Sequence, residues 1–169
     1  MANPTWTHAG APIPDEHDPM TAGVGAASWA KDRADRPDLT VHGEPRIQPM
    51  SVLSGWHVDK DDANPIGMSV VAGDGQVAGE VADLWVDRAE PAIRFLQLKG
   101  EGAPVLVPMG YCRISNGQVH VKAIYAQHFG SIPRPRSNDR ITLLEEDKVV
   151  AFFAGGYRFA DASRNEPLF

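Results

Sequence analysis

The feature that most constrains this chain is a series of short strand-like runs separated by turn signals, which begins at residue 51. Gly73-Asp74-Gly75 and Asn116-Gly117 each separate two apolar runs, and such residues permit the positive φ angles of tight hairpin turns. Short strands at this spacing are typical of a small antiparallel barrel or sandwich. We therefore predict a mainly β domain, a small antiparallel barrel, over residues 51–137.

The two ends of the chain have a different composition. Residues 1–50 are rich in proline, glycine, aspartate and alanine without sustained periodicity, which predicts an extended N-terminal arm. Tryptophan and methionine side chains interrupt this arm, so we expect it to pack on its own domain or on a partner. Residues 138–160 predict a C-terminal helix that begins at a capping box of Thr142 and Glu145, and a frayed tail follows at 161–169.

Composition argues against several classes of function. The 169-residue chain has a formal net charge of −6, which argues against nucleic acid as the main partner. The single cysteine, Cys112, can form no intrachain disulfide, and no Cys/His cluster predicts a metal site. No run approaches the roughly 18–20 apolar residues of a membrane span, so we expect a water-soluble polypeptide. No nucleophile elbow, phosphate loop or dinucleotide fingerprint predicts an active site.

Ionisable side chains gather at one predicted hairpin end within residues 81–100. Asp87, Arg88 and Glu90 occupy the turn, and Arg94 follows in the next strand. Such a charged end is commonly a solvated turn. The alternative is that Glu90 and Arg94 meet across the turn, because a carboxylate beside a guanidinium suits a proton relay or electrostatic tuning. The spacing alone leaves both interpretations open.

A second candidate site lies in the arm, where His42 is followed two residues later by Glu44. In an extended strand the two side chains would point the same way, close enough to share a proton or a surface metal ion. The alternative interpretation is a solvated loop histidine, which is the commoner situation for such a segment.

A series of short sequence blocks runs between residues 18 and 160: DPMTAGVGAASW (18–29), RIQPM (46–50), GWHV (55–58), NPIG (64–67), AGEVADLWVD (78–87), RFLQL (94–98), VPM (107–109), VHV (119–121), FGSIP (129–133), TLLEEDK (142–148) and AGG (154–156). In this order the blocks resemble the cytoplasmic portion of the H subunit of the purple-bacterial photosynthetic reaction centre. Each block is weak alone, but their common order over nearly the whole chain makes the resemblance specific.

The resemblance implies a PRC-type β-barrel that caps the cytoplasmic face of the L and M subunits. The family's domain is anchored by one N-terminal transmembrane helix, which this sequence lacks, so we expect a soluble fragment of a protein that lies at the cytoplasmic face of the inner or chromatophore membrane. The resemblance also implies a non-catalytic subunit that binds no cofactor itself. Bacteriochlorophyll, bacteriopheophytin, quinone and non-haem iron are expected in the partner subunits.

The family's proton path to the secondary quinone can be placed on this sequence residue by residue. The resemblance assigns Glu90 to the acidic residue of the relay, Arg94 to its neighbouring arginine and His42 to an entrance histidine. Where the family has a second entrance histidine this chain has Glu44, and where it has an aspartate this chain has Thr40. We therefore expect an altered entrance, in which Glu44 accepts protons.

Asp87 and Arg88 receive no role from the resemblance, and we expect them to be solvated or interfacial. Two other functions compete with the reaction-centre interpretation: a free-standing PRC-barrel adaptor that binds another protein, and a soluble enzyme. Matching blocks in the arm and the C-terminal helix argue against the adaptor, and the enzyme lacks any catalytic constellation. The sequence therefore predicts a structural cap and proton conduit of a photosynthetic reaction centre.

Overall fold

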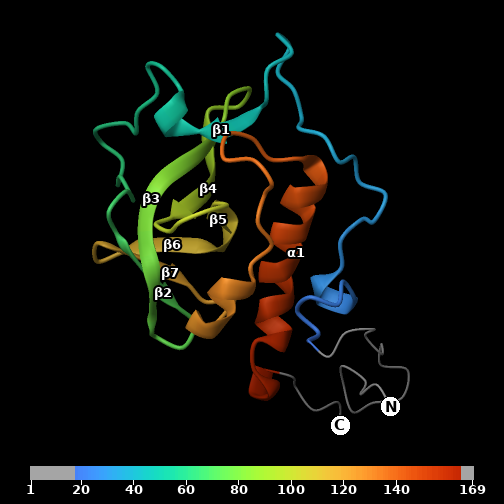
Figure 1. Cartoon of the computed structure of the whole chain (residues 1–169). Coiled ribbons are helices and arrows are strands. Elements are labelled where there is room, and N and C mark those ends of the chain that lie inside the picture. Colours follow the sequence, from blue (N-terminus) through green and yellow to red (C-terminus); the bar gives the residue numbers. More distant parts are fainter. Residues whose placement is uncertain (1–17, 165–169) are drawn as a thin grey trace.

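Residues 18–164 are described by the computed structural model of the chain, and they form a curved β-sheet with one long helix beside it (Figure 1). The elements are β1 (Ile47–Pro49), β2 (Ser69–Ala72), β3 (Val77–Asp87), β4 (Ala92–Leu98), β5 (Val105–Pro108), β6 (Cys112–Ser115), β7 (Gln118–Val121) and α1 (Leu143–Phe159). The prediction of a mainly β fold with a C-terminal helix is confirmed.

The sheet curves without closing into a barrel. Its strands lie in the order β5-β4-β3-β2-β7-β6, and β1 pairs with β3 outside this path. Irregularities in the pairing of β3 with β4 interrupt the regular register, as bulges do where a strand bends. The closed barrel expected from the sequence would pair β5 with β6. Instead, α1 packs against β5 and covers that side of the sheet.

One strand pairing is parallel, although the sequence predicted an antiparallel sheet. β2 runs parallel to β7, with Ser69 opposite Gln118 and Ala72 opposite Val121, and the other pairs are antiparallel. The turn signals themselves were interpreted correctly, since Asn116 and Gly117 have φ angles of 53° and 69° in the turn that joins β6 to β7. Turn residues determine the pairing within a hairpin, but they carry no information on how two hairpins join.

Helix α1 begins at the predicted capping box. The Thr142 hydroxyl accepts a hydrogen bond from the Glu145 amide at 3.1 Å, and the Glu145 carboxylate accepts one from the Thr142 amide at 2.9 Å. Near the other end, a Cβ on Gly155 would lie 2.5 Å from the Cβ of Ala27. Glycine at this position therefore allows the N-terminal segment to lie directly on the helix.

The described part of the predicted arm packs on its own domain. Met20, Ala27 and Ile47 are buried, and β1 joins the arm to β3. This outcome is the first of the two alternatives that the sequence left open for the arm. Residues 1–17 of the arm and 165–169 of the tail lie outside the described residues.

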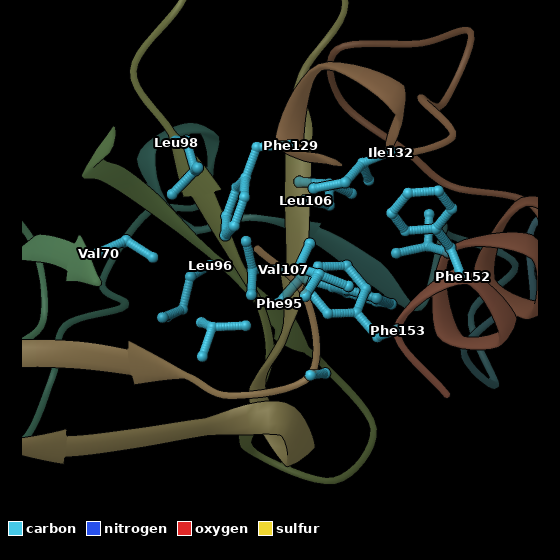
Figure 2. Close-up of a cluster of buried hydrophobic side chains, with 14 of the residues drawn as sticks. Val70, Phe95, Leu96, Leu98, Leu106, Val107, Phe129, Ile132, Phe152 and Phe153 are labelled. Atoms are coloured by element: carbon cyan, nitrogen blue, oxygen red, sulfur yellow. The ribbon is translucent and has the colours of Figure 1, made fainter. Parts of the chain in front are cut away.

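The hydrophobic core joins the inner face of the sheet to α1. Figure 2 shows Phe95 and Val107 of the sheet beside Phe153 of the helix. Trp85, near the end of β3, is fully buried, and its indole Nε1 donates a hydrogen bond to Gln97 Oε1 at 2.7 Å. The packed core thus fixes the β3–β4 hairpin in position almost as far as its charged end.

Within residues 18–164, none of the helices has the length and apolarity that a membrane crossing requires.

Candidate functional site

Asp87, the last residue of β3, is the buried centre of the charged hairpin end. Its side chain is 2% exposed, and Arg46 Nε donates to both carboxylate oxygens at 2.9 Å. The backbone amides of Ala89 and Glu90 donate to Oδ1 at 2.9 and 3.1 Å. The prediction that Asp87 is solvated or interfacial is therefore wrong. A carboxylate placed just before a tight turn can accept the amide hydrogen bonds of that turn, which offsets the cost of burying it.

These contacts keep Asp87 ionised. Burial alone would raise the pKa of Asp87, but the hydrogen bonds from Arg46 and from the Glu90 and Ala89 amides outweigh it and hold the pKa below its ordinary value of 3.8. The hydrogen bond that Arg46 donates to Asp87 in turn raises the pKa of Arg46, against the opposing effect of burial. Asp87 and Arg46 therefore form a permanent ion pair and do not exchange protons themselves.

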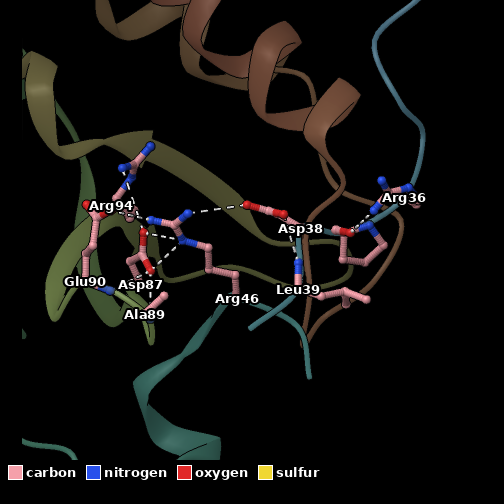
Figure 3. Close-up of polar contacts among 9 residues, drawn as sticks. Arg36, Asp38, Leu39, Arg46, Asp87, Ala89, Glu90 and Arg94 are labelled. Atoms are coloured by element: carbon pink, nitrogen blue, oxygen red, sulfur yellow. Dashed lines mark hydrogen bonds and ion pairs between the residues drawn. The ribbon is translucent and has the colours of Figure 1, made fainter. Parts of the chain in front are cut away.

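Arg46 reaches the hairpin end because β1 pairs with the last residues of β3. Ile47 lies opposite Asp87, and the Arg88 amide donates to the Arg46 carbonyl at 2.8 Å. The guanidinium also contacts Asp38 at 3.4 Å and Glu90 at 3.2 Å. Figure 3 shows Arg46 between these carboxylates, with dashed lines to each. One partly buried guanidinium thus fixes acidic groups from separate segments.

The predicted relay residues Glu90 and Arg94 lie at this cluster, but the ion pairs of the described residues do not join them to each other. Glu90 forms its ion pair with Arg46, and its side chain remains 78% exposed. Arg94 Nη1 lies 4.0 Å from Asp87 Oδ2, and its side chain is about half exposed. The contact expected between Glu90 and Arg94 across the turn is therefore replaced by two others. Arg46 pairs with Glu90, and Asp87 contacts both Arg46 and Arg94.

The predicted entrance segment is a tight turn rather than the extended strand considered from the sequence. The Gly43 amide donates to the Thr40 carbonyl at 2.9 Å, and the Thr40 amide donates to the Glu44 carbonyl at 2.8 Å. His42 is exposed at the tip, and its side chain contacts no partner among residues 18–164. The same range contains no group of three or more His, Cys, Asp or Glu residues arranged to hold a metal ion.

Arg88 connects this turn to the hairpin end. Its guanidinium contacts Glu44 Oε2 at 2.6 Å and donates to Gln48 Oε1 at 2.8 Å. Arg88 is therefore a structural link between two segments, where the sequence suggested a solvated or interfacial residue. Together with Thr40, His42, Trp56 and Ala89 it lines a hollow of about 360 Å³. The structure thus brings the two predicted parts of the proton path onto one side of the domain.

An apolar groove lies on the other flank of the hairpin end. It has a volume of about 600 Å³, and its apolar lining comes from Met50, Trp56, Val58, Val86, Pro91, Ala92, Ile93 and Met109. Asp59 and Asp62 stand at its border with solvent. Apolar side chains with acidic groups around them are typical of a surface that contacts another protein.

Sequence reasoning missed Arg46 and Asp38, the residues that organise the cluster. Both are separated from Asp87 by about forty residues or more in the chain, and only the pairing of β1 with β3 brings them to it. The one available signal was the position of Arg46 at the start of the RIQPM block, directly before a short apolar run.

Comparison with protein families gives two adjacent matches. Residues 1–52 match the model for the photosynthetic reaction centre H-chain N-terminal region, and residues 58–128 match the PRC-barrel domain. The first range contains the turn with His42 and Glu44. The second contains the hairpin end with Glu90 and Arg94, so both parts of the candidate site fall inside a matched region.

Proposed function

Because the chain is an H subunit-like protein of the photosynthetic reaction centre, we propose that it caps the L and M subunits of that complex and conducts protons toward the secondary quinone. An H chain is a structural subunit, so the chain performs no turnover of its own. In this proposal the pigments, the quinones and the non-haem iron are bound by the L and M subunits. The protein works at the cytoplasmic face of the inner or chromatophore membrane.

The observation that carries the proton-conduction proposal is the way in which the hairpin end presents Glu90. A buried ion pair of Asp87 and Arg46 fixes the turn, and Arg46 then holds a carboxylate that is 78% exposed. A reduced quinone takes up two protons, and each has to pass through groups that accept and release protons. An exposed carboxylate in a fixed position is suited to hand protons to an acceptor on a partner subunit.

The entrance of the path is assigned to the turn with His42 and Glu44. The imidazole of His42 is exposed to bulk water, so it can exchange protons directly with solvent. Glu44 lies beside it and contacts Arg88, which follows Asp87 directly in the chain. Protons would thus move from His42 and Glu44 along the hollow lined by Arg88 toward Glu90, with the arginines holding the carboxylates in place.

The capping proposal is supported by apolar surface near the same side of the domain. The groove of about 600 Å³ shares the hairpin residues Pro91, Ala92 and Ile93 with the segment that presents Glu90. Val41 is 96% exposed at the tip of the entrance turn. Burying these side chains against partner subunits would be favourable at roughly 25 cal/mol per Å² of apolar surface, and it would exclude water from the proton path.

The experiment is a Glu90→Gln substitution in a reaction centre assembled with this subunit, followed by flash-induced electron transfer to the secondary quinone. The amide keeps the shape of the side chain but cannot exchange the proton. We expect the second, proton-coupled electron transfer to slow by at least about tenfold near neutral pH, a change of about 1.4 kcal/mol in activation free energy. The first transfer requires no stoichiometric proton delivery and should change much less.

Glu80→Gln provides the matched control. Glu80 is also an exposed acidic residue of the β3–β4 hairpin, but it pairs with Lys99 near the opposite end of that hairpin. If Glu90→Gln and Glu80→Gln give the same rate of second electron transfer as the wild-type subunit, the proposed proton path through the hairpin end is excluded.

A further inference from the structure

Glu146 is an acidic residue on the side of α1 that faces the sheet. Val149 and Phe153, one and two turns further along the helix, are buried in the core, so Glu146 lies on the same stripe. The preceding residue, Glu145, is already engaged in the capping box and pairs with Arg136 at 3.0 Å. Glu146 is half-buried, and its carboxylate has no hydrogen bond or ion pair with any residue in the described range 18–164.

Glu146 lines a groove to which Arg94 also contributes. This groove has a volume of about 420 Å³ and separates α1 from β4 and from the segment after β5; its other lining residues are Ile93, Phe95, Pro108, Met109, Gly110, Tyr111 and Val150. Arg94 is thus shared between this groove and the charged hairpin end, where it lies 4.0 Å from Asp87 Oδ2. A groove of this size has room for several water molecules beside the guanidinium of Arg94.

We propose that Glu146 is a second proton-exchanging carboxyl of this subunit, which takes protons from water in the groove and holds them beside Arg94, behind the hairpin end that presents Glu90. The proton balance is simple: the carboxylate gains a proton from groove water when negative charge develops near the hairpin end, and it returns that proton when the charge is removed. The link to quinone reduction rests on the function proposed above, whereas the exchange at Glu146 does not.

The burial of Glu146 beside this groove favours such exchange near neutral pH. Burial raises the pKa of Glu146 to about 7, and this effect outweighs the attraction of Arg94. The surrounding ionisable groups are Arg94 on β4, Asp38 and Arg33 on the N-terminal segment, Asp147 on the same helix and Tyr111 at the groove wall. Asp38 also contacts Arg46 at 3.4 Å, so it links Glu146 electrostatically to the cluster that holds Glu90.

The first test is a carboxyl ¹³C NMR titration of the 169-residue chain with labelled glutamate. The resonance that disappears in Glu146→Gln identifies Glu146, and we expect its titration midpoint near pH 7, more than two units above that of an ordinary exposed glutamate. Asp147→Asn is the control, because it removes a neighbouring carboxylate from the same helix and should leave that resonance in place. A midpoint below pH 5 for Glu146 would overturn the inference.

The second test measures proton uptake by an assembled reaction centre after one flash, with a pH-sensitive dye at pH 7. We expect Glu146→Gln to lower the uptake measurably, and Glu80→Gln, which changes an acidic residue near the opposite end of the β3–β4 hairpin, to leave it near the wild-type value. If Glu146→Gln leaves uptake unchanged while Glu90→Gln slows the second electron transfer, the proposed function stands and this inference fails. If neither variant has an effect in the assembled complex, the proton path itself is excluded, and the role of Glu146 in quinone reduction is excluded with it.

Discussion

Replacing Asp87 by asparagine should destabilise the domain strongly, because it breaks a buried ion pair while leaving Arg46 in place. Removing one partner of a buried pair typically costs about 3–5 kcal/mol, since the remaining charge stays buried without compensation. In this protein Arg46 keeps its contacts to Asp38 and Glu90, and its side chain is 26% exposed, which reduces the loss. We therefore expect Asp87→Asn to lower the free energy of unfolding by about 2–4 kcal/mol.

The assay is reversible unfolding by denaturant and by heat, followed by circular dichroism. For a domain of this size about 1 kcal/mol corresponds to roughly 2–4 °C, so the melting temperature should fall by about 5–15 °C at pH 7. Glu80→Gln is the matched control, because it converts another acidic residue of β3 to an amide at an exposed ion pair, where the expected loss is about 0–1 kcal/mol. Equal melting temperatures for Asp87→Asn and Glu80→Gln would refute the assignment of Asp87 as the buried centre.

The pH dependence provides a second check on the same residue. The folded-state pKa of Asp87 lies below the ordinary value of 3.8, so its charge stabilises the folded state above that pH, and the stabilisation is lost as the pH falls through the folded-state pKa. The difference in the free energy of unfolding between the wild-type chain and Asp87→Asn should therefore have its largest value at pH 7 and should decrease below about pH 3.8. A difference that stays constant down to pH 2 would show that the contact does not depend on charge.

Three further predictions follow from other contacts. Thr142→Ala removes the helix cap and the hydrogen bond to Asp35 at 3.0 Å, so denaturant unfolding should show a loss of about 1–2 kcal/mol in the free energy of unfolding. Thr142→Ser keeps the hydroxyl and should lose less stability. Gly155→Ala should lower the melting temperature, because the new Cβ would lie 2.5 Å from the Cβ of Ala27, and this clash outweighs the better helix propensity of alanine. Adding Ala27→Gly to this variant should restore part of the lost stability. Cys112 in the folded chain should react with a thiol reagent at pH 8 far more slowly than Cys112 in the unfolded chain, because burial raises the pKa of its thiol to about 12. Equal reaction rates for the folded and unfolded chains would contradict its burial.

The local parts of the fold were predictable from the sequence, because each depends on residues close together in the chain. The Asn116-Gly117 turn and the Thr142/Glu145 capping box are set by residues within about four positions of one another. The parallel pairing of β2 with β7 is different, since it joins residues that lie about fifty positions apart. It depends on how the whole core packs, with α1 placed against β5, and no turn signal encodes that arrangement.

The candidate site was predictable in its location but not in its connections. The charged hairpin end was evident, yet the pairing of Glu90 with Arg94 that its spacing suggested is absent from the described residues, where Glu90 contacts Arg46 instead. Spacing within one hairpin says nothing of a guanidinium that arrives from another segment. Asp87 was misjudged for a related reason, because a charged residue in a turn is usually solvated unless a partner from elsewhere compensates its burial.

The buried ion pair gives the hairpin end a property that a solvated turn lacks, namely a fixed position for its exposed carboxylate. Asp87 anchors Arg46 through short contacts on both carboxylate oxygens, and Arg46 in turn holds Glu90 at 3.2 Å. Stability and function are therefore expected to depend on the same contact.

A domain that retains its fold after Asp87→Asn should still present Glu90 less rigidly, because the guanidinium that holds Glu90 would lose its own anchor. In an assembled reaction centre this variant should slow the second electron transfer even at temperatures well below its melting point. If instead it loses several kcal/mol of stability and keeps the wild-type transfer rate, the ion pair serves the fold alone, and the orientation of Glu90 is set by the partner subunits.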